Sequence, residues 1–485
     1  MNRELRRVSA VILAMFLTLF VSSSVIQVIA VNALEADGRN VRVLYDSFST
    51  ERGPILVDGV PIAESQPVDD AYSYLRVYSN GVLYAPVTGY LTLNQGNTGI
   101  EDAMNEELSG TSDAQFVDQV NALVTGQNPK GASVELTIDP VVQQAAWDAL
   151  GANTGAIVAI EPKTGKILAM VSKESYDPNV LASHESSSAV IQHYQDLLAN
   201  PNKPLVNRAI GGDLYHPGSI FKIIMTAAAL SGGDYTPDSE FPNPGQLQLT
   251  GTETFISNAE GGSCGGGATA SIATALRLSC NIPFAQLGQA MGEDRIRAMA
   301  ESFGFGKKIS IPMTSTASIY PSGMDAAQLE LSSFGQFDDK VTPLQMAMVS
   351  AAVANGGVIM QPTLVETVTA PDLRVIQAFQ PSVFSTPING DVAATMTQMM
   401  IADVSNGAAS NARISGVDVA GKTGTAENGE GQAYTLWFTG FAPANDPRVA
   451  IAVVVENGGG RGQNAFGNLI AAPMAKKVLE AVLSR

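Results

Sequence analysis

The Ser-Ile-Phe-Lys tetrapeptide at residues 219–222 offers the clearest chemistry in this 485-residue chain, where it is the only Ser-x-x-Lys. A Pro-Gly pair precedes it and an apolar run over residues 223–230 follows, which predicts that a helix begins here. Residues three apart share one face of a helix and differ in height by about 4.5 Å. Ser219 is therefore a candidate nucleophile beside Lys222, a lysine able to take a proton if burial or a nearby cation disfavours its charge. The tetrapeptide alone is also compatible with a chance pairing on a helix surface.

Two later motifs decide between these alternatives. The Ser-Cys-Asn tripeptide at residues 279–281 is the only Ser-x-Asn in the chain, and a Lys-Thr-Gly tripeptide follows at 422–424. Ser-x-x-Lys, Ser-x-Asn and Lys-Thr-Gly, in this order, are the motif set of penicillin-binding proteins and class A β-lactamases. The three motifs together favour chemistry through a serine acyl-enzyme.

A second Lys-Thr-Gly, at residues 163–165, precedes the serine and so has the wrong order. It lies between the apolar runs 155–160 and 166–171, which predicts that it forms the turn of a β-hairpin. We therefore exclude it from the candidate site.

Lys422 has a different setting. Two apolar stretches, 434–442 and 448–456, follow it and are separated by an Asn-Asp-Pro turn. We expect Lys422 to lie at the edge of an antiparallel meander, facing a cleft. Amphipathic helices predicted at 141–150 and 466–483 would pack on this sheet, which gives an α+β fold.

With these motifs, the chain resembles the class B penicillin-binding proteins, and among them the penicillin-binding protein A family of actinobacteria. The resemblance implies a penicillin-binding transpeptidase fold, an antiparallel sheet flanked by helices, on a β-rich membrane-proximal platform with one N-terminal transmembrane helix. It also implies that no glycosyltransferase domain is present. The segments that carry the likeness are residues 51–55, 215–219, 278–284, 421–427 and 437–443.

The resemblance implies D,D-transpeptidation of peptidoglycan stem peptides, with β-lactams as inhibitors. Ser219 would attack the carbonyl between two D-alanines and Lys222 would accept its proton. Ser279 would relay a proton to the leaving amine while bonding to Lys222, and Asn281 would read the substrate backbone. Lys422 would keep Lys222 neutral and attract the substrate carboxylate.

The strand that follows Lys422 supplies the predicted substrate-binding residues, Thr423, Gly424 and Thr425. Both threonine hydroxyls are expected to bind the carboxylate. The main-chain N–H groups of Ser219 and Thr425 are expected to form the oxyanion hole, in which one donor is worth roughly 3 kcal/mol in other enzymes.

The N-terminal segment predicts a membrane anchor. Basic residues lie within 1–7, a predicted cytoplasmic tail, and the uncharged stretch 8–31 exceeds the roughly 20 residues that a bilayer requires. Cleavage as a signal peptide, near the small residues Ala33 and Ala36, is the alternative. In both cases the remainder is expected outside the cytoplasm.

Two further regions follow the predicted anchor. Residues 32–150 are interpreted as the platform and 151–485 as the transpeptidase domain, with a long helical region from 219 to about 350. Strand-like pieces of the platform are predicted at 41–45, 55–57, 75–77 and 90–93.

The chain has only two cysteines, Cys264 and Cys280, and an oxidising compartment would allow them to pair. Two unpaired apolar thiols are the alternative. The formal net charge of −18 argues against nucleic acid as a partner. The three histidines are too scattered for a metal site, and no cofactor is expected.

Several functional alternatives share these motifs. A D,D-carboxypeptidase or a β-lactamase differs in what resolves the acyl-enzyme, and a division-complex scaffold or β-lactam sensor is a different class of protein. Expected partners are stem peptides, β-lactams and the membrane, together with cell-division or elongation proteins, including a lipid II polymerase.

Overall fold

The computed structural model describes residues 3–30, 50–115, 130–184, 186–259 and 261–485. It begins with helix α1 (Arg3–Ser24) and one π-helical turn, η1 (Val25–Ile29). The helical stretch Leu5–Gln27 has a mean hydropathy of 2.2 and is long and apolar enough to cross a membrane. The strand predicted at 41–45 and the alternative cleavage site near residues 33–36 lie outside the described residues.

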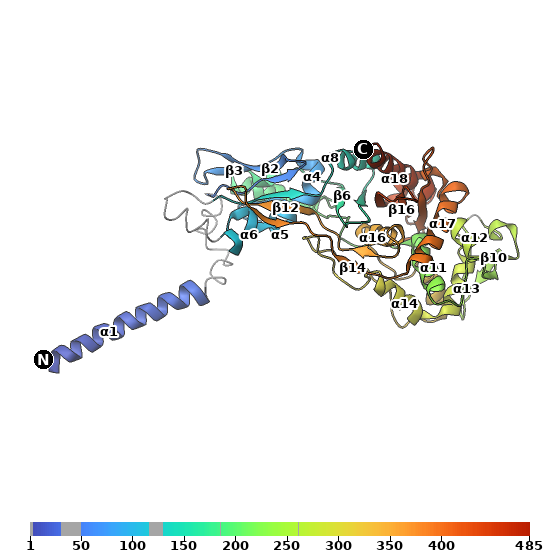
Figure 1. The fold of residues 1–485 in the computed structure, drawn as a ribbon, viewed down its shortest axis with the longest axis horizontal. Coiled ribbons are helices and arrows are strands. Elements are labelled where there is room, and N and C mark those ends of the chain that lie inside the picture. Colours follow the sequence, from blue (N-terminus) through green and yellow to red (C-terminus); the bar gives the residue numbers. More distant parts are fainter. Residues whose placement is uncertain (1–2, 31–49, 116–129, 185, 260) are drawn as a thin grey trace.

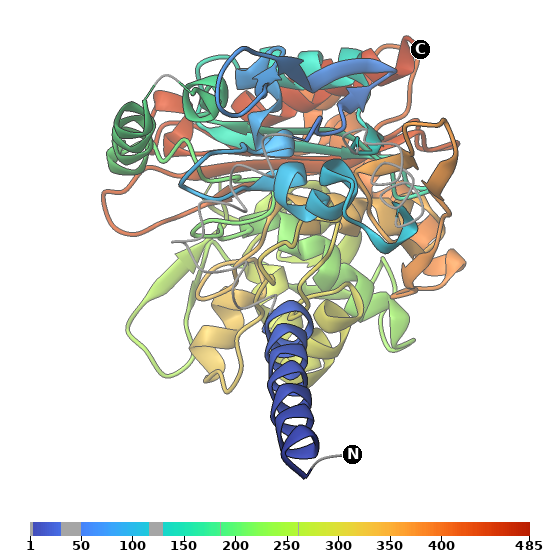
Figure 2. The ribbon, with the colours of Figure 1, turned by 90° about the vertical axis from the view of Figure 1, so that its left-hand side faces the viewer.

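A central antiparallel sheet forms the middle layer of the catalytic part. In the described chain it has five strands in the order β15-β16-β17-β5-β6. The last strand in sequence, β17, therefore lies beside β5, the earliest strand of this sheet (Figure 2). The predicted hairpin and the predicted meander are both confirmed. The strands are β5 (Gly155–Ile160), β6 (Ile167–Lys173), β15 (Ala420–Ala426), β16 (Thr435–Ala442) and β17 (Val449–Val455).

Helices cover both faces of the central sheet, which explains why its inner strands β16, β17 and β5 are buried along their whole length. Along β17, Ala450 and Val454 face one core, while Ile451 and Val453 face the other. The two predicted amphipathic helices, α8 (Pro140–Leu150) and α18 (Gly467–Leu483), lie on the second face. Helix α16 (Pro343–Ala354) packs on the first face.

The helices around the nucleophile pack in the same core as α16. The helical region predicted from 219 to 350 is interrupted, because small strands form in its Gly- and Pro-rich part. The helices are η3 (Gly218–Phe221), α11 (Lys222–Ser231), η4 (Cys264–Gly266), α12 (Ile272–Arg277), α13 (Ile282–Met291), α14 (Glu293–Ser302), α15 (Ala326–Ser332) and α17 (Gly390–Asn406). The interrupting strands are β7 (Glu240–Pro242), β8 (Gln246–Gln248), β9 (Phe255–Ser257) and β10 (Thr269–Ser271).

The platform contains a second sheet, with the order β13-β12-β4-β1-β2-β3. Two of its strands come from late in the chain, and β12 pairs antiparallel with β4, so that Val368 lies opposite Val134 (Figure 1). The sheet therefore crosses the domain boundary predicted at residue 150. Its strands are β1 (Ile55–Val57), β2 (Val60–Pro67), β3 (Tyr74–Tyr78), β4 (Ser133–Leu136), β12 (Val365–Thr369) and β13 (Val375–Ala378).

The prediction of a strand at 90–93 is wrong. Only Leu91 forms an isolated bridge, with Asn97, because this segment buries its apolar side chains against loops and helices and not in a sheet. The remaining elements are α4 (Gly81–Thr88), α5 (Gly99–Ala103), α6 (Asn105–Ser109), η2 (Asp113–Gln115), α9 (Asn179–Ala182), α10 (Ser187–Ala199), β11 (Ile359–Met360), β14 (Val383–Ser385), η5 (Ser410–Ala412) and η6 (Asn457–Gly460).

A buried ion cluster holds the platform sheet to its helices. The Glu101 carboxylate accepts from Arg52 Nε at 2.6 Å, from Arg76 Nε at 2.7 Å and from the Tyr78 hydroxyl at 3.2 Å. Burial by itself would raise the pKa of Glu101, but the two guanidinium groups outweigh it and hold that pKa below its ordinary value. Arg52, in the segment 51–55 that contributes to the family likeness, therefore has a structural role in the platform.

We expect Glu101→Ala to destabilise the platform by about 3–5 kcal/mol, because it leaves two buried guanidinium groups without a counter-charge. Glu51→Ala is the matched control, since it breaks the exposed Glu51–Lys130 pair and is expected to cost less than about 1 kcal/mol. Chemical denaturation of the full chain in detergent measures both. The Glu101 contribution is present above the ordinary pKa of 4.5 and is lost as the pH falls through the lower folded value. Equal losses in the free energy of unfolding for the two variants would contradict the structural role of Glu101.

Candidate active site

Ser219 lies in a 3₁₀ turn, η3, and not in the first turn of the α-helix that the sequence predicts. The turn is half-buried at Ser219 and leads directly into α11 at Lys222. Gly218 has a φ of 54° and donates its N–H to Gly335 O at 2.9 Å. A Cβ at Gly335 would lie 2.0 Å from Gly218 O, so only glycine lets these two segments approach.

Lys222 is fully buried and its Nζ lies 2.9 Å from Ser219 Oγ. The same amine donates to Ser279 O and to Asn281 Oδ1, both at 2.8 Å. Burial is the main cause that lowers the pKa of Lys222 well below its ordinary value, and the positive charge of Lys422 lowers it further. The structure thus brings the predicted nucleophile and base together, with an amine whose charged form is disfavoured.

The Ser-x-Asn motif lies in the turn that ends helix α12. The N–H of Cys280 bonds to Ala275 O at 2.9 Å, and Ser279 has a left-handed φ of 61°, as in a helix C-terminal turn. Ser279 bonds to Lys222 as expected, and it does so through its main-chain carbonyl. The proton relay through its hydroxyl stays a prediction. Asn281 contacts Lys222 through its side-chain oxygen, and its predicted contact with the substrate backbone stays a prediction.

The Lys-Thr-Gly motif lies on β15, the edge strand of the central sheet, as predicted. Gly424 lies against the nucleophile turn, since a Cβ there would be 2.9 Å from Pro217 O and 3.2 Å from Ile220 Cγ2. The Thr423 hydroxyl donates to Ala408 O at 2.9 Å, and the Thr425 hydroxyl accepts from Gly467 N at 3.1 Å. Both hydroxyls already have a partner within the chain, and their predicted contact with a carboxylate stays a prediction.

Lys422 has a counter-ion that the sequence does not indicate. Asp403, on α17, lies with its Oδ2 3.4 Å from Lys422 Nζ, and both side chains are fully buried. Burial raises the pKa of Asp403 to about 6, and the ammonium of Lys422 opposes this rise. Burial also lowers the pKa of Lys422, which Asp403 opposes in turn. Asp403 is separated from every motif in sequence, so only its position in the fold reveals it.

The excluded Lys-Thr-Gly lies away from this cluster. The Lys163 side chain is 61% exposed and pairs with Asp446 at the surface. His216, which precedes the nucleophile, has its Nε2 2.9 Å from Lys340 Nζ, while its carbonyl accepts from Trp437 Nε1 at 2.9 Å. Through these two contacts His216 attaches the loop before the nucleophile to residue 340 and to β16.

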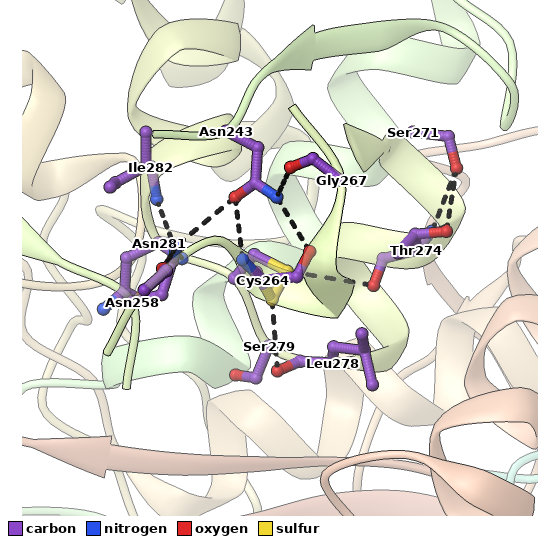
Figure 3. Close-up of a disulfide and its surroundings, with 12 residues drawn as sticks. Asn243, Asn258, Cys264, Gly267, Ser271, Thr274, Leu278, Ser279, Asn281 and Ile282 are labelled. Atoms are coloured by element: carbon purple, nitrogen blue, oxygen red, sulfur yellow. Dashed lines mark hydrogen bonds between the residues drawn. A yellow bond between two sulfur atoms is a disulfide. The ribbon is translucent and has the colours of Figure 1, made fainter. Parts of the chain in front are cut away.

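Cys264 and Cys280 form a disulfide, with Cα atoms 5.8 Å apart (Figure 3). The bond joins the η4 turn to the centre of the Ser-x-Asn motif. Cys280 is fully buried, so the bridge attaches the loop of Ser279 and Asn281 to the strands that precede α12. Of the two alternatives left by the sequence, the structure has the paired one.

Comparison with known proteins places the chain in a class. The chain belongs to the penicillin-binding protein transpeptidase family, whose transpeptidase-domain model matches residues 155–480. The model of a penicillin-binding protein A dimerisation domain matches residues 52–134.

Particular relatives match over the whole chain. It is 42% identical to peptidoglycan D,D-transpeptidase PbpA of Mycolicibacterium smegmatis and 40% identical to PbpA of Mycobacterium tuberculosis, over 100% of this chain and 99% of each relative. The ceftriaxone acyl-enzyme of M. tuberculosis penicillin-binding protein A superposes with a TM-score of 0.87 at 40% identity, over 90% of this chain and 100% of that one. A D,D-transpeptidase domain from Eggerthella lenta gives 0.78 at 34% identity, over 90% of this chain and 99% of that one.

We expect Asp403→Asn to destabilise the protein by about 3–5 kcal/mol, because it leaves Lys422 as a buried amine without its counter-ion. The combined Asp403→Leu, Lys422→Met variant removes both charges and is expected to regain most of that stability, since an apolar pair of similar volume needs no compensation. Denaturant titration of the full chain in detergent checks both variants. A single variant within 1 kcal/mol of wild type would show that the ion pair is not what stabilises this site.

Proposed function

We propose that this chain is a membrane-anchored peptidoglycan D,D-transpeptidase that works through an acyl-enzyme on Ser219. The observation that carries the proposal is the 2.9 Å separation of Ser219 Oγ from the buried Lys222 Nζ, in a chain of the transpeptidase family. β-Lactams are its inhibitors, since a relative of 40% identity has a ceftriaxone acyl-enzyme.

The first half of the reaction forms the acyl-enzyme. Ser219 Oγ attacks the carbonyl carbon between the two D-alanines of a stem peptide, and its proton passes to neutral Lys222. The C–N bond then breaks and the D-alanine amine leaves with a proton, delivered from Lys222 directly or through the Ser279 hydroxyl. The N–H groups of Ser219 and Thr425 stabilise the oxyanion. The position of β15 at the edge of the sheet supports this, because alternate N–H groups of an edge strand have no strand partner.

The second half releases the product as a cross-link. An amine of a neighbouring stem attacks the acyl carbon, a new amide forms and Ser219 regains its proton. Lys422, with Thr423, Gly424 and Thr425, binds the donor carboxylate by charge and hydrogen bonds. The Asn281 amide keeps one donor and one acceptor position beyond its two contacts within the chain, and these can bind the substrate backbone.

The proposal includes an arrangement at the membrane. Residues 1–7 are cytoplasmic and 8–31 span the bilayer. Outside the cytoplasm, residues 32–150 form the platform, whose sheet β12 and β13 complete, and 151–485 form the transpeptidase domain. The apolar helix and the basic residues before it support this orientation. The proposed partners are cell-division or elongation proteins, including a lipid II polymerase, because a transpeptidase cross-links glycan strands that a polymerase makes.

We expect one β-lactam to be bound covalently per chain, on Ser219. Intact mass and peptide mapping of the full chain in detergent after exposure to penicillin check this. An adduct that persists for hours is expected for a transpeptidase, whereas rapid release of hydrolysed penicillin would indicate a β-lactamase. Product analysis with a stem peptide and an amine acceptor separates cross-linking from carboxypeptidase activity. A stable adduct on another residue, or none, would refute the proposal and leave a scaffold role.

We expect Lys222→Ala to slow acylation by about 10²- to 10⁴-fold, because a general base contributes on this scale. The fold is expected to survive, since alanine places no charge in the cavity. Lys163→Ala, in the excluded Lys-Thr-Gly, is the matched control and is expected to acylate at the wild-type rate. Stopped-flow measurement with a fluorescent penicillin compares the three proteins. A wild-type rate in Lys222→Ala would mean that another group takes the serine proton.

A further inference from the structure

Two buried asparagines, Asn243 and Asn258, lie beside the disulfide and the Ser-x-Asn motif (Figure 3). Neither belongs to one of the three sequence motifs. Asn243 is 1% exposed and Asn258 is 3% exposed. Figure 3 shows both amides pointing toward the loop that carries Cys264 and the start of the segment that carries Asn281. Buried amides are retained only where their donors and acceptors are satisfied, so their partners identify what they hold in place.

Asn258 holds the main chain of Asn281. Its Oδ1 accepts from the N–H of Asn281 at 2.9 Å and from the N–H of Ile282 at 3.1 Å. These N–H groups lie at the start of helix α13. Asn281 is the N-cap residue of this helix, and its side chain makes no capping hydrogen bond. Asn258 thus satisfies donors that a helix start leaves free, from a different segment of the chain.

The segment that contains Asn258 also holds the side chain of Asn281. Asn281 Nδ2 donates to Ser257 O at 3.1 Å, while its Oδ1 accepts from Lys222 Nζ at 2.8 Å. Residues 257 and 258 therefore fix both the backbone and the amide plane of Asn281. The direction of the acceptor offered to Lys222 depends on them.

Asn243 fixes Asn258 in turn. Its Oδ1 accepts from Asn258 Nδ2 at 3.2 Å and from Cys264 N at 3.1 Å. Its Nδ2 donates to Cys264 O at 2.8 Å and to Gly267 O at 3.1 Å. Asn243 thereby uses both donors and both acceptor positions of its amide, and the loop of the Ser-x-Asn motif has a polar attachment in addition to the disulfide.

We infer that Asn258 is a positioning residue for acylation, which acts through Asn281 to set the place of the Lys222 amine, with Asn243 as its support. The inference rests on the proposed function of Ser219 and Lys222. A base displaced by a fraction of an ångström from its nucleophile loses much of its effect, because proton transfer requires hydrogen-bond geometry. The charged groups that face Lys222 are Lys422 on β15 and Asp403 on α17, and Asn258 changes neither of them.

The test is the rate constant of acylation by a fluorescent penicillin, measured from pH 5 to 10 on the full chain in detergent. We expect Asn258→Ala to acylate about tenfold more slowly at neutral pH, with the acid limb of its pH profile moved to higher pH. The limb moves because a loosened Asn281 admits water around Lys222, which restores its pKa toward the ordinary value. A purely structural role would lower the fraction of chains that acylate and would leave the rate per site and the acid limb unchanged.

Gln143→Ala is the matched control. Gln143 is a fully buried amide that bonds to Met170 N, Met170 O and Leu83 O, and it contacts β6 at the opposite edge of the sheet from β15. The Gln143→Ala variant is expected to acylate at the wild-type rate with an unchanged pH profile. A slow rate in this control would attribute the effect to the loss of any buried amide and overturn the inference.

A double-mutant cycle tests the route through Asn281. If Asn258 acts through it, Asn258→Ala adds no further loss in an Asn281→Ala background, whereas independent losses multiply and overturn the inference. A wild-type rate and acid limb in Asn258→Ala also overturn it. If that variant does not fold, Asn243→Ala takes its place, with about a threefold loss expected and an unchanged rate contradicting the inference. Failure of the wild-type chain to acylate would refute the proposed function instead.

Discussion

The site depends on the burial of two amines in one cluster. Lys222 and Lys422 are both fully buried, and an isolated buried charge is too costly unless it is paired or neutralised. The two lysines meet this constraint differently. Lys422 has the Asp403 carboxylate 3.4 Å away, while Lys222 has hydrogen-bond acceptors from the Ser-x-Asn loop and a pKa lowered by burial. Lys422 thus has a counter-charge within the protein, while the charged form of Lys222 is disfavoured.

The fold brings three distant segments together around these amines. The central sheet is covered on both faces, and β15 forms its edge, where the strand contacts the nucleophile turn. Gly218 and Gly424 permit the nucleophile turn to contact this strand, since side chains there would meet backbone atoms within 3 Å. The disulfide, with Asn258 and Asn243, fixes the third segment, which holds Lys222 from the opposite side.

The platform, like the active site, is assembled from segments that lie far apart in the chain. Strands β12 and β13 come from between the helices of the catalytic part and complete a sheet with β1 to β4. The Glu101 cluster then ties the two platform arginines to a helix. The platform and the catalytic part are therefore joined by a shared sheet.

Residue type and order determined much of this protein by themselves. The sequence predicted the pairing of Ser219 with Lys222, the edge strand of Lys422, the exclusion of residues 163–165 and the covering helices, because these follow from local periodicity, turn residues and motif order. Only the tertiary structure placed Asp403 beside Lys422 and Asn258 beside the main chain of Asn281. It also showed that Lys222 bonds to the main-chain carbonyl of Ser279. Each of these depends on contacts between segments far apart in the chain or on a single backbone φ, and no local pattern encodes them.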